Sequence, residues 1–555
     1  MTDTLSHLLC RGLTRVGVDS LYCLPGVQND DFFNVLFDFP EIRPIVARHE
    51  QATSYMATGA ALATGNPQAY CTVPGQGMLN AAAGHSTAFS AAARVFALVG
   101  QNRSDLVGQM HGLLHEIPDQ MAVLGQISKQ SEALRDPSAA SGQIASAFNV
   151  LISGHPAPVT VECPVDLWSA EGKDAAIAEP AFPDVDLDRI HEAADLLASA
   201  KRPLVMLGGG AQDAAESIAA LAEMLGAPVS ALRQGKGAYD ERRPLAVPGP
   251  VAHQYWAEAD VVLGIGTRFQ WQEMTWGTDD ELKLIQITAD PGELNRRGNI
   301  AVSIHAMTEH AVPKLVDALA TRLPTRPDRT DDIAARKAAF NADLAELQPT
   351  VGDLAVIADV LGEDGVFVDD LTQVAYAARF AYPVPRPRGY VCAGYAGTLG
   401  WGVPAGLGVA NAMLGRPVLT VQGDGGFLYG ANELATAVKY KIPLVTLVYN
   451  DSAYGNVQRI QEQRFGHNRT IATDLVNPDM VKFAESFGAL GVRAGPGPEG
   501  LRTALETAFA SGGPAVVEVP VTERYPSPWK NIFLPTVRGE QQTPLLAAPN
   551  AAQPR

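Results

Sequence analysis

Residues 418–456 read VLTVQGDGGFLYGANELATAVKYKIPLVTLVYNDSAYGN. A β-branched run, VLTVQ, leads into the turn GDGG at 423–426, and a helix-forming stretch separates it from a second run, LVTLVYN. This order predicts two parallel strands joined by a crossover helix. It places Asp424 and Asp451 at the carboxyl ends of consecutive strands, where open α/β sheets bind ligands.

The residue types at these two strand ends suit an anion and a hard cation. Glycines after Asp424 let backbone N–H groups approach an anion closely, and the following helix adds its positive end. Two carboxylates beside such an anion favour magnesium over zinc. The alternative is that GDG forms a tight turn and that Asp451 caps a helix.

The rest of the chain repeats the alternation of short β-branched runs with longer Ala-rich stretches. Segments rich in Pro and charge interrupt it at about 168–186 and 321–335. We therefore predict the α/β class, with three doubly wound parallel-sheet domains. They comprise an N-terminal domain (1–170), a central domain (186–322), a C-terminal domain (350–530) and a tail (531–555).

One internal similarity links the first and third domains. The segments PVTVECPV at 158–165 and PAVVEVPV at 514–521 share the pattern P-x-x-V-E-x-P-V. Val-rich strands resemble one another, so chance is the alternative. The repeat favours one plan for both domains.

Bulk properties exclude several classes of partner. The net charge is −18 over 555 residues, which argues against nucleic acid and anionic membranes, because those surfaces are met by clustered Lys and Arg. The five cysteines show no metal-ligand spacing. No long apolar run or basic leader is present in the sequence. We expect a cytoplasmic protein.

The spacing of the two aspartates carries a family resemblance. Asp451 follows Asp424 by 451 − 424 = 27 residues. This register resembles the thiamine diphosphate motif of acetolactate synthases, pyruvate and benzoylformate decarboxylases and benzaldehyde lyase, in which an Asn-Asn pair follows GDG. The resemblance implies thiamine diphosphate and Mg2+ as cofactors. It implies Asp424, Asp451 and the carbonyl of Ala453 as metal ligands, with Asp451 standing where most members have Asn.

A second part of the resemblance lies in the first domain. The run RPIVAR leads into His49-Glu50 and a helix of small residues. In the family, a Glu in an R-H-E sequence contacts the aminopyrimidine ring of the cofactor, so Glu50 is implied as the catalytic carboxylate. The alternative is a Glu that stabilises the first turn of a helix.

The resemblance also implies further cofactor contacts from short glycine-containing segments. Leu399, in GTLGWG, falls where an aliphatic residue wedges the cofactor into its bent shape, although a core Leu is the alternative. The implied cofactor-binding residues are Gly26, Gly75, Asn80, Thr372, Gln373, Gly397, Leu399, Gly423, Gly425, Gly426, Tyr454, Gly455 and Asn456.

The central segment contains RPLVMLGGGAQ, ADVVLGIGTRF and LKLIQITADP. Its glycines at 208–210 lack the G-x-G-x-x-G spacing of a dinucleotide site. FAD or nucleotide binding in this domain is therefore left open and gains no support from the sequence.

Three first-domain residues are candidates for handling the substrate. Gln28 lies in the loop LPGVQND, where family members present polar or small residues toward the substrate. His115 and Glu116 lie in a segment similar to the acetolactate synthase F-Q-E-x-D stretch. His115 could relay protons, because an imidazole can both donate and accept protons near neutral pH. The alternative is a surface His beside a Glu.

One difference leaves the reaction open. Acetolactate synthases carry M-V-x-x-W after their Asn-Asn pair, whereas this chain has Ile460 at the Trp position. We predict a carboligase or lyase acting on a small 2-oxo acid or 2-hydroxy ketone. The alternatives are a 2-oxo acid decarboxylase that releases an aldehyde and a non-catalytic flavin- or nucleotide-binding regulatory homologue.

The resemblance also predicts the assembly. Glu50 lies in the first domain and the metal ligands lie in the third. In the family, these domains face each other from different subunits. We expect a homodimer or homotetramer with the cofactor at the subunit interface.

Overall fold

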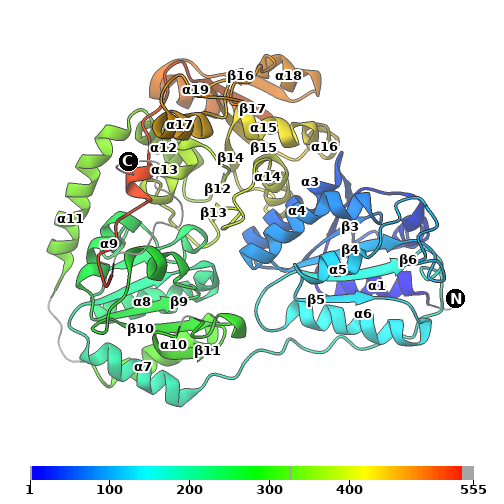
Figure 1. The fold of residues 1–555 in the computed structure, drawn as a ribbon, viewed down its shortest axis with the longest axis horizontal. Coiled ribbons are helices and arrows are strands. Elements are labelled where there is room, and N and C mark those ends of the chain that lie inside the picture. Colours follow the sequence, from blue (N-terminus) through cyan, green and yellow to red (C-terminus); the bar gives the residue numbers. More distant parts are fainter. Residues whose placement is uncertain (1–2, 297, 324–327, 541–555) are drawn as a thin grey trace.

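The structure is a computed structural model that describes residues 3–296, 298–323 and 328–540. It has three lobes, each built on a parallel sheet covered by helices (Figure 1). The prediction of three doubly wound α/β domains is confirmed.

The first sheet has six parallel strands in the order β2-β1-β3-β4-β6-β5. Its strands are β1 (Ser20–Cys23), β2 (Arg43–Val46), β3 (Gln68–Thr72), β4 (Val95–Gln101), β5 (Gln130–Ala133) and β6 (Val159–Pro164). One face packs on α1 (Leu5–Arg15), α2 (Asp30–Leu36) and α6 (Pro137–Ile152), and the other on α3 (Glu50–Thr64) and α4 (Gln76–Ala91). Helices on both faces bury every residue of the four inner strands β1, β3, β4 and β6, which explains their apolar runs, whereas the edge strands β2 and β5 are partly exposed.

The third sheet repeats the first. Its strands are β12 (Val366–Asp369), β13 (Tyr390–Val391), β14 (Val418–Gly423), β15 (Leu444–Asn450), β16 (Leu490–Arg493) and β17 (Ala515–Pro520). Their order, β13-β12-β14-β15-β17-β16, matches the first sheet strand for strand. The two P-x-x-V-E-x-P-V segments form β6 and β17, which hold equivalent places. The prediction of one plan for both domains is therefore confirmed.

The central sheet has the order β11-β10-β9-β7-β8. Its strands are β7 (Pro203–Leu207), β8 (Val229–Ala231), β9 (Val261–Ile265), β10 (Lys283–Thr288) and β11 (Ile300–His305). The glycines after β7 pack against the turn after β9, since a Cβ on Gly266 would lie 2.4 Å from the carbonyl carbon of Gly210. This close approach of two backbones accounts for the three-glycine turn without a bound phosphate.

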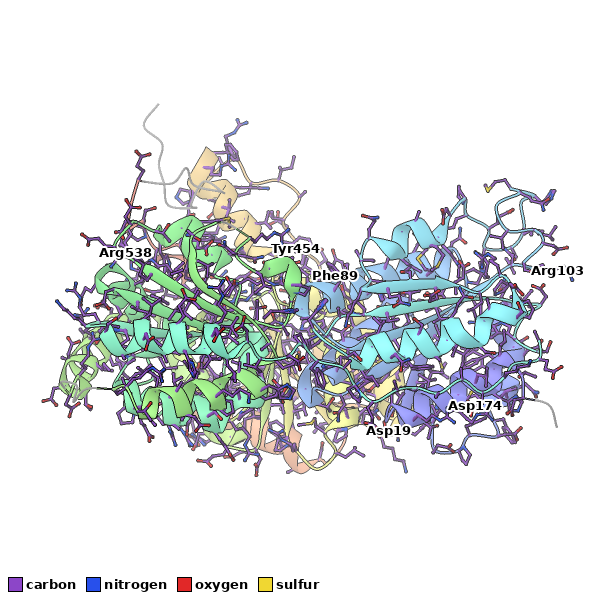
Figure 2. The ribbon with its side chains drawn as sticks, turned by 90° about the horizontal axis from the view of Figure 1, so that it is seen from below. Asp19, Phe89, Arg103, Asp174, Tyr454 and Arg538 are labelled. Carbon is purple, nitrogen blue, oxygen red and sulfur yellow. The ribbon has the colours of Figure 1, made fainter. Side chains whose placement is uncertain are left out.

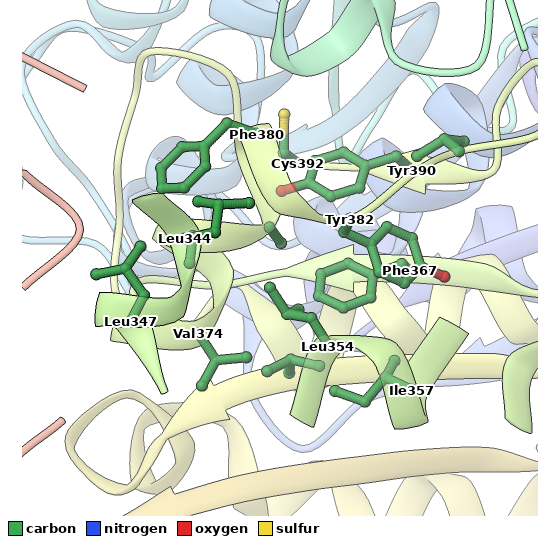
Figure 3. Packing of buried hydrophobic residues seen from close by; sticks show 14 of the residues in the cluster. Leu344, Leu347, Leu354, Ile357, Phe367, Val374, Phe380, Tyr382, Tyr390 and Cys392 are labelled. Carbon is green, nitrogen blue, oxygen red and sulfur yellow. The ribbon is translucent and has the colours of Figure 1, made fainter. Parts of the chain in front are cut away.

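The third domain lies between the other two. On one face, α14 (Gly402–Ala412) crosses α3 of the first domain, and a Cβ on Gly408 would lie 1.9 Å from the carbonyl oxygen of Met56. On the other face, a second core joins α12 (Thr350–Leu361) and α13 (Gln373–Ala381) to the central domain. Figure 3 shows part of this core, in which the rings of Phe367 and Tyr390 stack at 5.3 Å.

The second of the two predicted connecting regions is partly helical. Part of the Pro-rich stretch expected at 321–335 is helical, because α11 begins at Thr330 and ends at Asp343. The ion pair from Arg336 to Glu258 and the hydrogen bond from the Tyr255 hydroxyl to Asp332 at 2.7 Å hold this helix against the central domain. The proline and charge content of this stretch did not predict these contacts.

The chain after β17 returns to the central domain. Arg538 donates from Nε to the carbonyl of Trp256 at 2.7 Å and from Nη1 to Asp279 at 2.8 Å (Figure 2). Residues 541–555 of the predicted tail lie outside the described residues. Across the described residues, we find no helix with the length and apolarity needed to cross a membrane.

Candidate active site

The predicted metal ligands stand at neighbouring strand ends. Strands β14 and β15 pair in parallel, with Gly423 opposite Tyr449. Asp424 is buried and begins α15 (Asp424–Gly430), while Asp451 directly follows β15. Burial and the facing Asp424 carboxylate raise the pKa of Asp451 to about 6. Two carboxylates that face each other in this way form a natural site for a cation.

The glycines of this region are required by close contacts. A Cβ on Gly455 would lie 2.2 Å from Oδ2 of Asp451, and one on Gly425 would lie 2.7 Å from the Tyr454 ring. A Cβ on Gly426 would come within 3.7 Å of the Leu399 side chain. The predicted wedge residue, Leu399, therefore lies beside the GDGG turn, and Gly397 has the positive φ of a tight loop.

A hydrogen-bond chain that sequence reasoning missed orients Asp424. Asn477 donates from Nδ2 to Oδ2 of Asp424 at 2.5 Å and to Oδ1 of Asn450 at 2.9 Å. Asn450 in turn donates to Glu518 at 2.8 Å. Glu518 is the carboxylate of the repeated P-x-x-V-E-x-P-V segment. Its equivalent, Glu162, receives a hydrogen bond from Gln101 at the end of β4. The repeat was the signal that could have identified both carboxylates.

Asp370 connects two segments of the third domain that carry predicted cofactor-binding residues. It follows β12 and accepts from the backbone N–H groups of Leu371 at 2.6 Å and Gly402 at 2.9 Å. Burial raises its pKa to about 7. Asp370 thereby ties the segment of Thr372 and Gln373 to the start of α14, just after Leu399. Its place at a strand end was the signal that could have identified it.

Gln373 and Asn456 lie together under the C-terminal segment. Gln373 donates to Asn456 at 3.4 Å, and the indole of Trp529 donates to the same Asn456 oxygen at 2.9 Å. Arg459 donates to Gln373 at 3.0 Å. The chain after β17 is thus part of this site, which the sequence did not reveal.

Glu50 begins α3, as predicted, and faces α4. Asn80 donates from Nδ2 to Oε2 of Glu50 at 3.1 Å, and a Cβ on Gly77 would lie 3.5 Å from Oε1. Gly75 caps α4 with φ of 54°, and its N–H donates to the side chain of Gln120 at 3.0 Å. Gln120 is buried and was not singled out from the sequence.

Two of the substrate-handling candidates meet beside the Gly75 turn. The ring Nδ1 of His115 lies 3.3 Å from Oε1 of Gln28. A Cβ on Gly75 would lie 2.1 Å from the carbonyl oxygen of His115, and one on Gly26 would lie 2.4 Å from Val73. The structure therefore places Gln28 and His115 in one cluster with the glycines predicted to bind the cofactor.

Glu116 differs from its neighbour. Its Oε2 accepts from the backbone N–H groups of Gly112 at 2.7 Å and Leu113 at 2.9 Å. Backbone hydrogen bonds, that of Leu113 foremost, lower the pKa of Glu116. The side chain therefore stabilises its own loop in this structure.

Comparison with known proteins decides what this arrangement is. Three family models match in order: the N-terminal TPP binding domain of thiamine pyrophosphate enzymes at residues 3–123, the central domain at 190–315 and the C-terminal TPP binding domain at 370–519. The chain belongs to the thiamine pyrophosphate enzyme family. It is a thiamine diphosphate-dependent enzyme of the carboligase or decarboxylase class, similar to acetolactate synthase.

Several relatives match this thiamine pyrophosphate enzyme over nearly its full length. The chain is 32% identical to a probable 2-ketoarginine decarboxylase of Pseudomonas aeruginosa, over 93% of this chain and 94% of the relative. It is 28% identical to a probable acetolactate synthase large subunit of Methanocaldococcus jannaschii, with 93% and 91% covered. It is 29% identical to the acetolactate synthase of Bacillus subtilis, with 93% of each covered.

The residues fit the cofactor of the family. Asp424 and Asp451 supply two hard oxygen ligands, and the described residues contain no cluster of three or more His, Cys, Asp or Glu that could hold a metal. A magnesium ion would therefore take further oxygens from the backbone, such as the carbonyl of Ala453, and from the diphosphate. The open side of Gly423, where a Cβ would meet nothing closer than 3.9 Å, leaves room for that group.

Among the described residues, no polar interaction joins the carboxylates of the two half-sites within one chain. Glu50 makes no hydrogen bond or ion pair with Asp424 or Asp451 there. The first and third domains meet instead through the hydroxyls of Tyr55 and Thr398, 3.0 Å apart, and through other contacts of α3. Glu50 thus lies in one half-site, in the first domain, and the predicted metal ligands lie in the other, in the third domain of this thiamine pyrophosphate enzyme.

Proposed function

We propose that this enzyme uses thiamine diphosphate and Mg2+ to form or cleave a carbon–carbon bond next to the carbonyl of a small 2-oxo acid or 2-hydroxy ketone. The observation that carries the proposal is the carboxylate pair Asp424 and Asp451 at the ends of β14 and β15. The same chain supplies Glu50 and its partner Asn80 on the matching half-site.

Each residue has a distinct task in this proposal. Asp424, Asp451 and the carbonyl of Ala453 hold the metal, and the backbone of the GDGG turn faces the diphosphate. Bound thiamine diphosphate supplies a carbon nucleophile that adds to carbonyl groups and stabilises the carbanion left when carbon dioxide departs. Glu50 would accept a hydrogen bond from the ring N–H of the bound cofactor and so favour its imino form, and Asn80 keeps Oε2 of Glu50 in position.

In this proposal, the first-domain cluster of Gln28 and His115 transfers protons to and from the substrate. His115 is the candidate acid–base group, since an imidazole near neutral pH both donates and accepts protons. Gln28 holds the ring through the 3.3 Å contact between Oε1 and Nδ1. Glu116 acts by shaping the loop that carries His115.

We further propose a homodimer or homotetramer in which each cofactor lies between two subunits. Exposed apolar side chains border both half-sites, as expected for surfaces that another chain covers. Val27 is 62% and Leu114 60% exposed beside the first half-site, and Val476, next to Asn477, is 100% exposed beside the second. The five cysteines are unpaired and buried, which favours a reducing compartment such as the cytoplasm.

A simple decarboxylase is the second candidate. Similarity to the probable 2-ketoarginine decarboxylase of Pseudomonas aeruginosa favours it. The presence of Ile460 at the Trp position of acetolactate synthases also favours a reaction without their acceptor.

Product analysis tests the proposal. The protein, loaded with thiamine diphosphate and Mg2+, should release carbon dioxide from 2-oxo acids. In the presence of pyruvate and an added aldehyde it should yield a 2-hydroxy ketone. Free aldehyde as the only product would support the second candidate. Absence of any carbon dioxide or ketone across a broad 2-oxo acid and 2-hydroxy ketone panel would refute the proposed function.

A further inference from the structure

Side chains of the third domain close the outer edge of the first sheet. Strand β2 is an edge strand, so alternate N–H groups along it point away from the sheet. The N–H of Val46 donates to the hydroxyl oxygen of Tyr440 at 2.9 Å. Two residues further on, the N–H of Arg48 donates to the carboxylate of Glu433, at 3.0 Å to Oε1 and 3.1 Å to Oε2. The third domain therefore holds the end of this strand through its backbone.

The Glu433 carboxylate receives hydrogen bonds from both domains. The residue is 0% exposed, and Thr436 donates from Oγ1 to its Oε2 at 2.6 Å. Burial raises the pKa of Glu433 to about 7. The Thr436 hydroxyl on its own helix, the backbone of Arg48 and His49, and the Arg48 charge all oppose this rise. Above pH 7 the group is thus mainly ionised, the form in which it accepts hydrogen bonds most strongly.

Glu433 also belongs to a run of helices that begins at the metal half-site. Helix α15 begins at Asp424, and η7 (Ala431–Glu433) and α16 (Leu434–Tyr440) follow it without a break. Helix α16 lies beside the first domain (Figure 1). The run that starts at a predicted metal ligand therefore ends on the segment that leads into Glu50.

The segment held by Glu433 determines where α3 begins. His49 is the N-cap of α3, and its Nδ1 accepts from the N–H of Gln51 at 3.2 Å. Glu50 is the first residue of that helix, two positions after Arg48. Fixing the Arg48 N–H therefore fixes the start of the helix and with it the position of the Glu50 carboxylate. Displacing a catalytic group by about 1 Å can lower a rate by roughly 100-fold.

We propose that Glu433 is a positioning residue for Glu50. By accepting the Arg48 N–H, it holds the first turn of α3 where Glu50 meets the ring of the bound cofactor. The inference rests on the proposed function, in which Glu50 accepts a hydrogen bond from that ring. A carboxylate suits this task, because it accepts hydrogen bonds more strongly than a neutral amide does.

Glu433→Gln tests the proposal, because the amide has nearly the same shape and keeps one oxygen for the Arg48 N–H. With a 2-oxo acid that the enzyme converts, kcat at pH 8 should fall by roughly 10-fold. The ratio of wild-type to variant kcat should shrink toward one between pH 8 and pH 6. Over that range wild-type Glu433 takes up a proton and becomes a weaker acceptor, and taking the ratio cancels the titration of other groups.

Tyr440→Phe is the matched structural variant. It removes the neighbouring hydrogen bond to Val46, and its effect on kcat should not change between pH 6 and pH 8. A pH-independent ratio for Glu433→Gln as well would leave Glu433 a purely structural role and overturn the inference.

A double-variant cycle connects the effect to Glu50. In the Glu50→Gln background, adding Glu433→Gln should lower the residual kcat by less than about twofold, because the positioned carboxylate is already lost. A further loss of roughly 10-fold would show that Glu433 acts independently of Glu50 and would contradict the proposal. Glu485→Gln, exposed on α18 (Met480–Ser486), is the control and should leave kcat unchanged in either background.

Hydrogen exchange tests the contact without turnover. With thiamine diphosphate and Mg2+ present at pH 8, the Arg48 amide should exchange roughly 10-fold faster in Glu433→Gln than in wild type, while exchange in the inner strand β4 stays the same. Unchanged exchange at Arg48 would overturn the inference and leave the proposed function standing. A wild-type enzyme that converts no 2-oxo acid or 2-hydroxy ketone would refute the proposed function, and the positioning role with it, even if the exchange result shows the contact.

Discussion

Replacing Glu50 with glutamine should lower kcat by roughly 100- to 10,000-fold while leaving the fold and cofactor binding intact. Glutamine has nearly the same shape and keeps an oxygen for the 3.1 Å hydrogen bond from Asn80. Its amide is, however, a weaker hydrogen-bond acceptor than a carboxylate, and the proposed task of Glu50 is to accept a hydrogen bond from the cofactor's ring N–H. A group that acts only in the transition state is lost from kcat and kcat/KM together.

Steady-state kinetics measure the expected loss of kcat, and a titration of the variant with thiamine diphosphate measures whether cofactor binding is retained. Glu41→Gln, an exposed glutamate of the same domain, is the matched control and should behave as wild type. A Glu50→Gln enzyme with near-normal turnover would remove Glu50 from the mechanism. Loss of folding would assign it a structural role instead.

Replacing Asp424 with alanine should weaken Mg2+-dependent cofactor binding by roughly 100-fold or more. Loss of groups that only orient a metal ligand already weakens metal binding by about 10- to 100-fold, and Asp424 is proposed as a ligand itself. The change also removes the acceptor of the 2.5 Å hydrogen bond from Asn477. Binding can be followed by calorimetry at several Mg2+ concentrations.

Asp451→Asn is the matched variant for this experiment. It restores the amide that most family members carry and keeps an oxygen for the metal, so cofactor binding should be retained. The Asp424 carboxylate then faces a neutral group, which removes the like-charge contact that raises the pKa of Asp451. Equal cofactor binding by Asp424→Ala with and without Mg2+ would place the metal elsewhere.

Much of the third domain could be predicted from the periodicity of apolar residues and from the residues that end the strands. The run LVTLVYN predicted β15 as it stands, and the order of strand, GDGG turn and strand predicted the paired ends of β14 and β15. Likewise, the start of α3 at Glu50 followed from the change of pattern after RPIVAR. These features are local, so neighbouring residues encode them.

Other features depend on residues far apart in the chain. Asn477 lies 53 positions from Asp424, and Trp529 lies 73 positions from Asn456. No spacing rule connects such pairs, because the loop and the returning C-terminal segment set their distance.

The half-sites raise the central question of assembly. In the described part of the chain, Glu50 makes no hydrogen bond or ion pair with Asp424, and the exposed apolar borders of the half-sites favour their meeting across subunits. A cofactor bound between two chains would also stabilise the dimer by mass action, by about 2.7 kcal/mol at a hundredfold excess over its dissociation constant.

Mixing two inactive variants, Glu50→Gln and Asp424→Ala, tests this account most directly. Differently tagged subunits, exchanged and purified as hybrids, should carry one site with both defects and one with neither. Each hybrid dimer should then recover roughly half of normal activity, although both parents are inactive. Hybrids without activity, despite proven exchange and bound cofactor, would contradict the account, because each chain would then build its site alone.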